Sequence, residues 1–289
     1  MKVSGFTFVR NAVKYDYPIV ESISSILPIC DEFIVCVGNS DDSTLDLIKT
    51  IEDKKIKIVH SVWNEDLREG GAVLAEETNK ALDSVSQDSD WAFYIQGDEV
   101  VHEKYLGEIN ASMIKYKDLK NVEGLLFKYL HFYGNYKYTG DSRKWYRHEI
   151  RIIRNDKKIR SFRDAQGFRK NGKLMKVKPV DAEIYHYGWV KNPLKQNEKL
   201  KNFHKYWHPD ETVKKMVKEA DSYDYTNIDS LKLFTDSHPA VMKNRISRLD
   251  WDFEFDISKK HFSFKNKIFD FIEKNTGKRL FEYKNYRII

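Results

Sequence analysis

The sequence contains only two cysteines, Cys30 and Cys36, among its 289 residues. Cys30 precedes a predicted strand and Cys36 lies inside it, which is a poor geometry for a disulfide, and two cysteines are too few for a zinc site. We therefore expect two buried thiols in a reducing compartment. No apolar run approaches the roughly 18 residues of a transmembrane helix, and residues 1–11 lack the features of a signal peptide. These absences predict a cytoplasmic protein, either free or at the inner face of the membrane.

The chain also lacks internal repeats, low-complexity linkers and Gly/Ser hinges. Its residues are 41% apolar and 33% charged, which provides for a real core and excludes disorder over most of the length. Lys and Arg number 50 against 44 Asp and Glu, so the formal net charge of +6 suits an anionic ligand without requiring nucleic acid. The length fits one large domain, or one domain with an extension.

The first hundred residues alternate short apolar runs with segments of helical periodicity. The predicted strands, rich in β-branched and aromatic residues, are 3–10, 32–37, 56–61 and 91–96, and the predicted helices are 18–27, 43–51 and 71–83. Repeated strand, helix, strand units predict an α/β fold with a Rossmann-like, mostly parallel central sheet flanked by helices. Ligands of such sheets bind beyond the carboxyl ends of the strands, so the residues that follow each strand should carry the function.

The texture changes in the second half. Longer aromatic strands separated by basic loops, from 124 to about 189, predict a mixed or antiparallel continuation of the same sheet. After Pro193 a Lys-rich helical stretch and an aromatic, basic tail predict a mostly helical C-terminal extension packed on the main domain. We expect the main domain to span 1–190 and the extension 191–289. The tail could dock on anionic lipid, cover an acceptor site or join subunits, although such a stripe is usually core plus a solvated face.

Polar turns follow the second and fourth predicted strands. Residues 38–44 (GNSDDST) open a helix, where backbone N–H groups can hold an anion and Asn or Asp can accept from a base or ribose hydroxyl. By itself this turn is explained more simply by Asp42 or Ser43 as a helix cap. Residues 96–99 (QGDE) place carboxylates at the open edge of the sheet, where oxygen ligands suit Mg²⁺ or Mn²⁺ on a diphosphate. A solvated acidic turn is the alternative.

In their order and spacing these motifs resemble the nucleotide-diphospho-sugar-binding region of family 2 glycosyltransferases, which have the GT-A fold. The matching segments are Phe8-Val9-Arg10-Asn11, Asp42-Ser43-Thr44, Gly71 with Asn79, and Gln96-Gly97-Asp98. The resemblance covers about residues 1–190 and implies that Asp98 is the acid that binds a divalent cation, Mn²⁺ or Mg²⁺. Two positions depart from the family pattern: Gln96 replaces the first acid of the Asp-x-Asp motif, and Gly38 and Asn39 replace the acid that usually holds the base or ribose.

The resemblance implies an inverting enzyme of hexosyltransferase type that moves a sugar from a nucleotide-diphosphate sugar to an acceptor hydroxyl, as in polysaccharide biosynthesis. Residues 1–115 would bind the donor and 116–190 would face a carbohydrate or lipid-linked saccharide acceptor, with membrane contact and homo-oligomer formation left open and no nucleic acid partner. A nucleotidyltransferase normally has a Gly-rich phosphate loop where Arg10-Asn11-Ala12 stands here. A non-catalytic carbohydrate- or nucleotide-binding protein would leave the acidic turn unused.

Candidate residues also occur in the second half. The resemblance to inverting members of the family implies an acid on the acceptor side that takes the proton of the attacking hydroxyl. Asp164 is the acid best placed for it in order along the chain, with Glu149 as the rival, although a salt bridge to a neighbouring Arg explains Asp164 equally well. His186 follows from the resemblance as a metal ligand or phosphate donor, although a lone His is more often structural. Arg151 shares a strand face with Glu149 and could clamp a diphosphate, or be an ordinary surface cation. The predicted site therefore comprises the base Asp164 or Glu149, the metal ligands Asp98 and His186, and the nucleotide-sugar-binding residues Arg10, Asn11, Asn39, Asp42, Gly71, Gln96, Gly97, Asp98 and Arg151.

Overall fold

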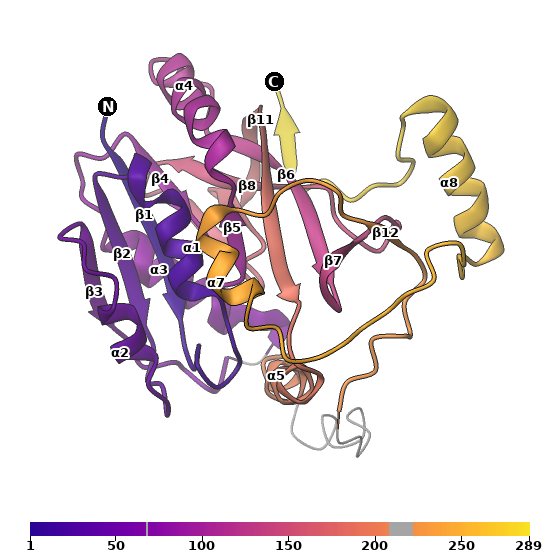
Figure 1. Ribbon diagram of the computed structural model, residues 1–289. Coiled ribbons are helices and arrows are strands. Elements are labelled where there is room, and N and C mark those ends of the chain that lie inside the picture. The colour runs from indigo at the N-terminus through magenta and orange to yellow at the C-terminus, as the bar shows by residue number, and fades with distance from the viewer. Residues whose placement is uncertain (68, 208–221) are drawn as a thin grey trace.

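The N-terminal part of the computed structural model, which describes residues 1–67, 69–207 and 222–289, is a parallel sheet (Figure 1). Its strands lie in the order β3-β2-β1-β4. The strands are β1 (Val3–Val9), β2 (Glu32–Val37), β3 (Ile56–His60) and β4 (Trp91–Tyr94), and the connecting helices are α1 (Ile19–Ile26), α2 (Thr44–Lys49) and α3 (Ala72–Asp83). All seven elements were predicted from the sequence, and their ends differ from the prediction by at most two residues.

Helices cover both faces of this parallel part. Along β2, Phe33, Val35 and Val37 pack in one apolar core with residues of α1, while Ile34 and Cys36 pack in a second core with residues of α3. Successive side chains of a strand point to opposite faces, so a strand covered on both sides must be apolar at nearly every position. This explains the continuous apolar runs in the sequence. Both cysteines are buried and free, as predicted.

The second half continues the sheet with mixed strand directions. The strand β4 pairs antiparallel with β8, which leads through β6 and β11 to β10 and β9. Only β6 and β11 run parallel along this path, and β5 and β7 pair at its side. The added elements are β5 (Glu99–Val101), α4 (Leu106–Tyr116), β6 (Gly124–Tyr133), β7 (Asn135–Gly140), β8 (His148–Arg154), β9 (Ile159–Phe162), β10 (Gly167–Lys170) and β11 (Lys173–Trp189). The predicted mixed continuation is therefore present.

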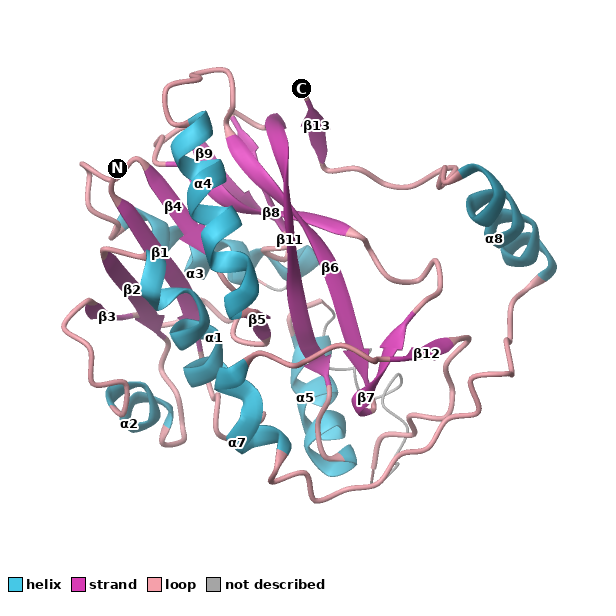
Figure 2. Ribbon diagram, turned by 45° about the horizontal axis from the view of Figure 1, so that its top comes forward, coloured by secondary structure: helices cyan, strands magenta, loops and turns pink. Residues whose placement is uncertain are grey.

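The C-terminal segment adds three described helices and two short strands. These are α5 (Pro193–Lys205), α7 (Lys243–Ile246), α8 (Phe264–Thr276), β12 (Leu231–Leu233) and β13 (Tyr286–Ile288). Because β12 pairs with β7 and β13 pairs with β11, this segment is joined to the main sheet. The helix α8 has no buried residue and stands apart from the sheet in both ribbon views (Figures 1 and 2).

The described residues also contain short 3₁₀ helices at Leu27–Ile29, Glu69–Gly71, Glu103–Tyr105 and Ala240–Met242. Among the helices of the described residues, none is both long enough and apolar enough to cross a bilayer. The strand order confirms the α/β class and the helix-flanked central sheet that the resemblance to the GT-A fold implies.

Candidate functional site

A cleft of about 410 Å³, which we call the inner cleft, opens where β1 and β4 end and is roofed by α5. The carboxyl ends of these parallel strands lie at the same edge of the sheet, which is where ligands of α/β sheets bind. Six of the predicted residues line the inner cleft: Arg10, Gln96, Gly97, Asp98, Asp164 and His186. Residues from four separate parts of the sequence therefore meet in one cleft.

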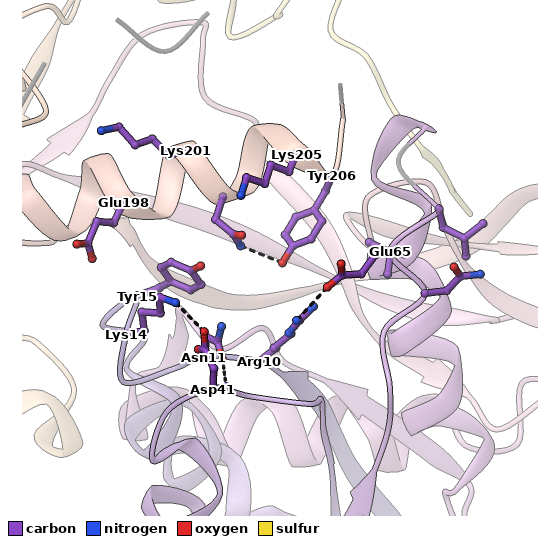
Figure 3. Close-up of a pocket in the computed structure, with 14 residues that line it drawn as sticks. Arg10, Asn11, Lys14, Tyr15, Asp41, Glu65, Glu198, Lys201, Lys205 and Tyr206 are labelled. Carbon is purple, nitrogen blue, oxygen red and sulfur yellow. Dashed lines mark hydrogen bonds and ion pairs between the residues drawn. The ribbon is translucent and has the colours of Figure 1, made fainter. Parts of the chain in front are cut away.

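A second hollow of about 480 Å³, the outer pocket, adjoins the inner cleft (Figure 3). The two hollows share Arg10, Tyr15, Asn202 and Tyr206 among their lining residues. In Figure 3, Tyr206 and the lysines of α5 stand opposite Arg10 and the turn after β1. Of the predicted nucleotide-binding residues, Asn11 lines this outer pocket, and its side-chain oxygen accepts a hydrogen bond of 2.9 Å from the backbone N–H of Asp41.

Asp98 and His186 meet in the inner cleft. Antiparallel pairing of β5 with β11 sets Glu99 opposite His186, so the residue before β5 lies beside the imidazole. His186 Nε2 is 3.8 Å from Asp98 Oδ1, and Lys199 Nζ is 3.4 Å from Asp98 Oδ2. Lys199 also donates a hydrogen bond of 2.9 Å to the carbonyl oxygen of Gly188. We call Asp98, His186 and Lys199 the open cluster.

The electrostatics of the open cluster favour a carboxylate beside a neutral imidazole. Burial raises the pKa of Asp98, but nearby positive charge, that of Lys199 foremost, outweighs this effect and lowers the pKa to about 2. Burial lowers the pKa of His186 below its ordinary value. An ionised carboxylate and a neutral imidazole are the forms in which these side chains bind divalent cations.

The space beside Asp98 and His186 depends on Gly188. A Cβ atom at position 188 would lie 2.7 Å from Asp98 Oδ2 and 2.8 Å from His186 Nε2, so any side chain would fill the gap. Among the described residues no group of three His, Cys, Asp or Glu side chains is arranged to hold a metal ion. Asp98 and His186 are thus two candidate ligands, and a cation would fit here if phosphate oxygens or waters supplied the others.

Asp164 lies on the same cleft, in the loop between β9 and β10. Its neighbours Arg163 and Ala165 have φ angles of 55° and 61°, a left-handed conformation that is uncommon outside glycine and that concentrates at functional sites. Gln96 Nε2 donates to the carbonyl oxygen of Ala165 at 3.2 Å, so the residue that replaces the first acid of the motif holds this loop. Burial raises the pKa of Asp164 above its ordinary value.

Glu149, the rival base, is sealed in the interior. Gln166 Nε2 and Asn285 Nδ2 each donate a hydrogen bond of 2.8 Å to its two carboxylate oxygens. Burial raises the pKa of Glu149 to about 7, but the side chain lines neither the inner cleft nor the outer pocket. Between the two acids, the geometry therefore favours Asp164.

Arg151 is fully buried and does not reach the cleft. Its Nη2 and Nε atoms donate to the two carboxylate oxygens of Glu99 at 2.7 and 2.8 Å. Its Nη1 atom donates to the backbone carbonyls of Ile150 and Gln166. The prediction that Arg151 binds a diphosphate is wrong. The side chain points from β8 into the core, where protein acceptors already take the hydrogen bonds of its guanidinium group.

Asn39 and Asp42 line neither hollow. Asn39 Oδ1 accepts from the backbone N–H of Trp63 at 3.2 Å. Asp42 accepts from the backbone N–H groups of Thr44 at 2.9 Å and of Lys14 at 2.7 Å, so it fixes the start of α2, the simpler of the two explanations of this turn. Both side chains hold neighbouring backbone in place, and neither lines the cleft.

Gly71 and Asn79 hold the loop of Asp164. Gly71 has a φ of 73°, and a Cβ there would lie 3.0 Å from Asp164 Cβ, so a glycine permits this close approach. Asn79 Oδ1 accepts from the backbone N–H of Ser161 at 2.9 Å. Gly71 and Asn79 therefore do not line the cleft but support the loop that carries Asp164.

Several lining residues were not predicted. The helix α5 contributes Gln196, Lys199 and Phe203, and other walls come from Tyr17, Trp63, Tyr146 and Trp189. The spacing of residues 196, 199 and 203 places them on one helix face, which the sequence could have revealed. No sequence pattern indicates where this face of α5 packs, so the sequence did not predict that α5 covers the cleft.

No protein-family model matches the chain, and no curated protein matches it. Among solved structures, TarS from S. aureus is 17% identical with a TM-score of 0.42, over 70% of this chain and 39% of TarS. TarS 1-349 in complex with UDP is 16% identical with a TM-score of 0.42, over 75% of this chain and 70% of that one. Glucosyl-3-phosphoglycerate synthase from Mycobacterium tuberculosis, in complex with Mn²⁺, UDP and phosphoglyceric acid, is 18% identical with a TM-score of 0.31, over 45% of this chain and 43% of that one.

This chain therefore spans 39% of the TarS chain and 43% of the synthase, which is less than half of each. The fold class given above rests on the strand order and register of this chain itself. In its motifs the chain resembles family 2 glycosyltransferases, and in structure it is similar in part to these proteins.

Proposed function

We propose that the protein is an inverting glycosyltransferase that takes a nucleotide-diphosphate sugar and transfers the sugar, a hexose, to an acceptor hydroxyl. The observation that carries the proposal is the meeting of Asp98, His186 and Asp164 in one cleft beyond the strand ends. A carboxylate and imidazole pair suits a cation on a diphosphate, and a separate half-buried carboxyl group, that of Asp164, suits proton removal. The order of motifs along the chain supports the same class.

The diphosphate would lie beside the open cluster. Asp98 and His186 would hold Mn²⁺ or Mg²⁺, which when bound offsets the negative charge that develops on the leaving diphosphate. Lys199 adds a fixed positive charge at the same place. The space that Gly188 leaves open supports the presence of a cation or a phosphate oxygen between these side chains.

The nucleoside would lie in the outer pocket. Arg10 pairs with Glu65 through Nη2 at 3.1 Å, whereas its Nε is buried without a hydrogen-bond partner in the described structure. A donor nucleotide can supply that partner, since an unsatisfied buried N–H group is unfavourable. Tyr15 and Tyr206 offer aromatic surface on the two walls of the same pocket.

Asp164 would act as the general base. As the acceptor oxygen bonds to the anomeric carbon, its proton passes to Asp164, the bond from that carbon to the diphosphate oxygen breaks, and the electron pair leaves with the nucleoside diphosphate. A carboxyl group whose pKa is raised by burial is the stronger base for this step. A carbohydrate or a lipid-linked saccharide is the acceptor class that fits a hydroxyl nucleophile.

The proposed division of labour assigns donor binding to 1–115, the acceptor side to 116–190 and closure of the cleft to 191–289. The position of α5 supports the last assignment, because Lys199 and Gln196 line the inner cleft from above.

The test is calorimetric titration of UDP with and without Mn²⁺. We expect affinity that requires the metal, and we expect Gly188→Ala to lose the metal-dependent part because its methyl group would occupy the space beside Asp98. The matched control is Gly107→Ala on α4, where an added Cβ meets nothing within 4 Å. Metal-independent UDP binding that Gly188→Ala leaves unchanged would contradict the proposal.

Product analysis separates the enzyme classes. A glycosyltransferase releases a nucleoside diphosphate from one member of a panel of nucleotide sugars. A nucleotidyltransferase would instead release pyrophosphate from a nucleoside triphosphate, and a non-catalytic binding protein would release neither.

A further inference from the structure

A pair of adjacent histidines determines which nitrogen of His186 is free. His131 lies in β6, and the parallel register of β6 with β11 pairs it directly with His186. His131 Nε2 is 2.8 Å from the backbone carbonyl oxygen of Tyr146. A carbonyl oxygen can only accept, so His131 Nε2 carries a hydrogen and donates it.

The other nitrogen of His131 must then accept. His131 is only 2% exposed, and its described polar contacts are the Tyr146 carbonyl and the His186 ring; the charge of Asp98 acts on it only from a longer range and is outweighed by burial. A buried, uncompensated charge is costly, so the ring is neutral and its Nδ1 bears a lone pair. This Nδ1 lies 3.1 Å from Nδ1 of His186, which therefore carries the hydrogen and donates.

His186 Nε2 is therefore unprotonated, and its lone pair faces Asp98. Its distance of 3.8 Å from Asp98 Oδ1 is too long for a hydrogen bond, and both atoms are acceptors. Only a cation or an added donor can satisfy two acceptors that face each other. Asp98 Oδ1 and His186 Nε2 would together hold a divalent cation, with the remaining ligands supplied by phosphate oxygens or waters.

The rings are held in this arrangement by their neighbours. Trp145 stacks on His131 with ring centroids 5.1 Å apart, and the Tyr146 ring meets His131 edge-on at 4.4 Å. The hydrogen-bond chain runs from the Tyr146 carbonyl through His131 to His186 and ends at the gap beside Asp98.

We infer that His131 is a positioning residue that fixes His186 in the tautomer protonated on Nδ1 and so commits its Nε2 to a divalent cation. The inference rests on the proposed function, in which that cation also binds the donor diphosphate. A partner that accepts from the far nitrogen of a metal-bound imidazole orients the ring and strengthens it as a ligand.

The direct test is ¹⁵N NMR of the histidine side chains in the metal-free protein at neutral pH. We expect His131 to be protonated on Nε2 and His186 on Nδ1. A His186 ring protonated on Nε2 would overturn the inference, and it would do so even if metal-dependent UDP binding were found.

A variant tests the consequence for the metal. His131→Phe keeps a ring of similar size but removes the acceptor, and we expect Mn²⁺ affinity in the presence of UDP to fall about 10- to 100-fold, as for other lost partners of metal ligands. The readout is the electron paramagnetic resonance signal of free Mn²⁺. His131→Asn, whose side-chain oxygen can still accept, should recover part of the loss.

His148→Phe is the matched control, because His148 lies in β8, lines neither the inner cleft nor the outer pocket, and has an Nδ1 without a hydrogen-bond partner among the described residues. It should leave Mn²⁺ affinity unchanged. Equal affinity in wild type and in folded His131→Phe would overturn the inference. If wild type binds no Mn²⁺ in the presence of UDP, the proposed function fails, but the NMR measurement still decides the tautomer of His186. If His131→Phe does not fold, the NMR measurement and His131→Asn decide whether His131 positions His186.

Discussion

Two adjacent acids, Asp98 and Glu99, lie in opposite environments. Asp98 lines the inner cleft, with Lys199 and His186 as its neighbours. Glu99 is fully buried and accepts from Nε and Nη2 of Arg151 and, at 2.7 Å, from the Tyr129 hydroxyl. We call Glu99, Arg151 and Tyr129 the sealed cluster. Asp98 ends the turn that precedes β5, whereas Glu99 is the first residue of that strand and points into the core.

The comparison of the two clusters shows that two carboxylates of the same charge can have different roles, one in stability and one in ligand binding. The sealed cluster joins β5, β6 and β8, and every acceptor in it has a fixed donor, so it holds the two halves of the site together. In the open cluster the nearest ammonium is 3.4 Å from its carboxylate, and a ligand can take that place. A variant of the sealed cluster should therefore affect folding, and a variant of the open cluster should affect binding.

The largest effect is expected for Asp98→Asn. Loss of the carboxylate should abolish transfer and weaken donor binding only when a divalent cation is present, because the metal then has one charged ligand fewer. Activity assays and calorimetry with and without Mn²⁺ measure both. Asp46→Asn, an exposed acid of α2, is the control. Full activity of Asp98→Asn would remove this residue from the site.

Asp164→Asn should lower turnover by about 10²- to 10⁴-fold while donor affinity stays nearly intact, because only proton removal is lost. Steady-state kinetics and donor titration separate these quantities. Glu149→Gln serves as the comparison, since its side chain lies outside the cleft. If the rate defect follows Glu149 instead, the role of base moves to that residue.

Arg151→Met should cost about 3 to 5 kcal/mol of unfolding free energy, because Glu99 would remain as a buried charge without its partner. Urea unfolding measures the loss. Adding Glu99→Gln to Arg151→Met should recover part of the stability, as expected for residues that interact directly. Lys199→Met should lower the unfolding free energy by less than Arg151→Met does. An equal loss in these two single variants would contradict the assignment of the sealed cluster to stability and the open cluster to binding.

Glu149, which borders the sealed cluster, should make stability depend on pH. Its pKa is raised from 4.5 to about 7 in the folded state, so its stabilising contribution is complete below pH 4.5 and is lost as the pH rises through 7. Between pH 5 and 8 the unfolding free energy should fall by about 2 to 3 kcal/mol from this group. Urea unfolding at both pH values should show this fall in wild type and not in Glu149→Gln.

The sequence by itself determined the elements of the first half and the place of the site. Alternation and helical spacing are local properties, so they predicted β1 to β4 and α1 to α3 within two residues. The position of Asp98 just after an apolar strand follows from the same local signal, because parallel strands end at a common edge. For these features no long-range contact had to be known.

Only the tertiary structure decided which side chains meet there. Alternation showed that Glu149 and Arg151 share a face of their strand, but not that this face is covered, and burial turned both away from the cleft. The register of β6 with β11 brings His131 to His186, and docking of α5 brings Lys199 to Asp98. Strand register and helix docking depend on the packing of the whole chain, because each is the sum of many weak contacts between segments far apart in sequence.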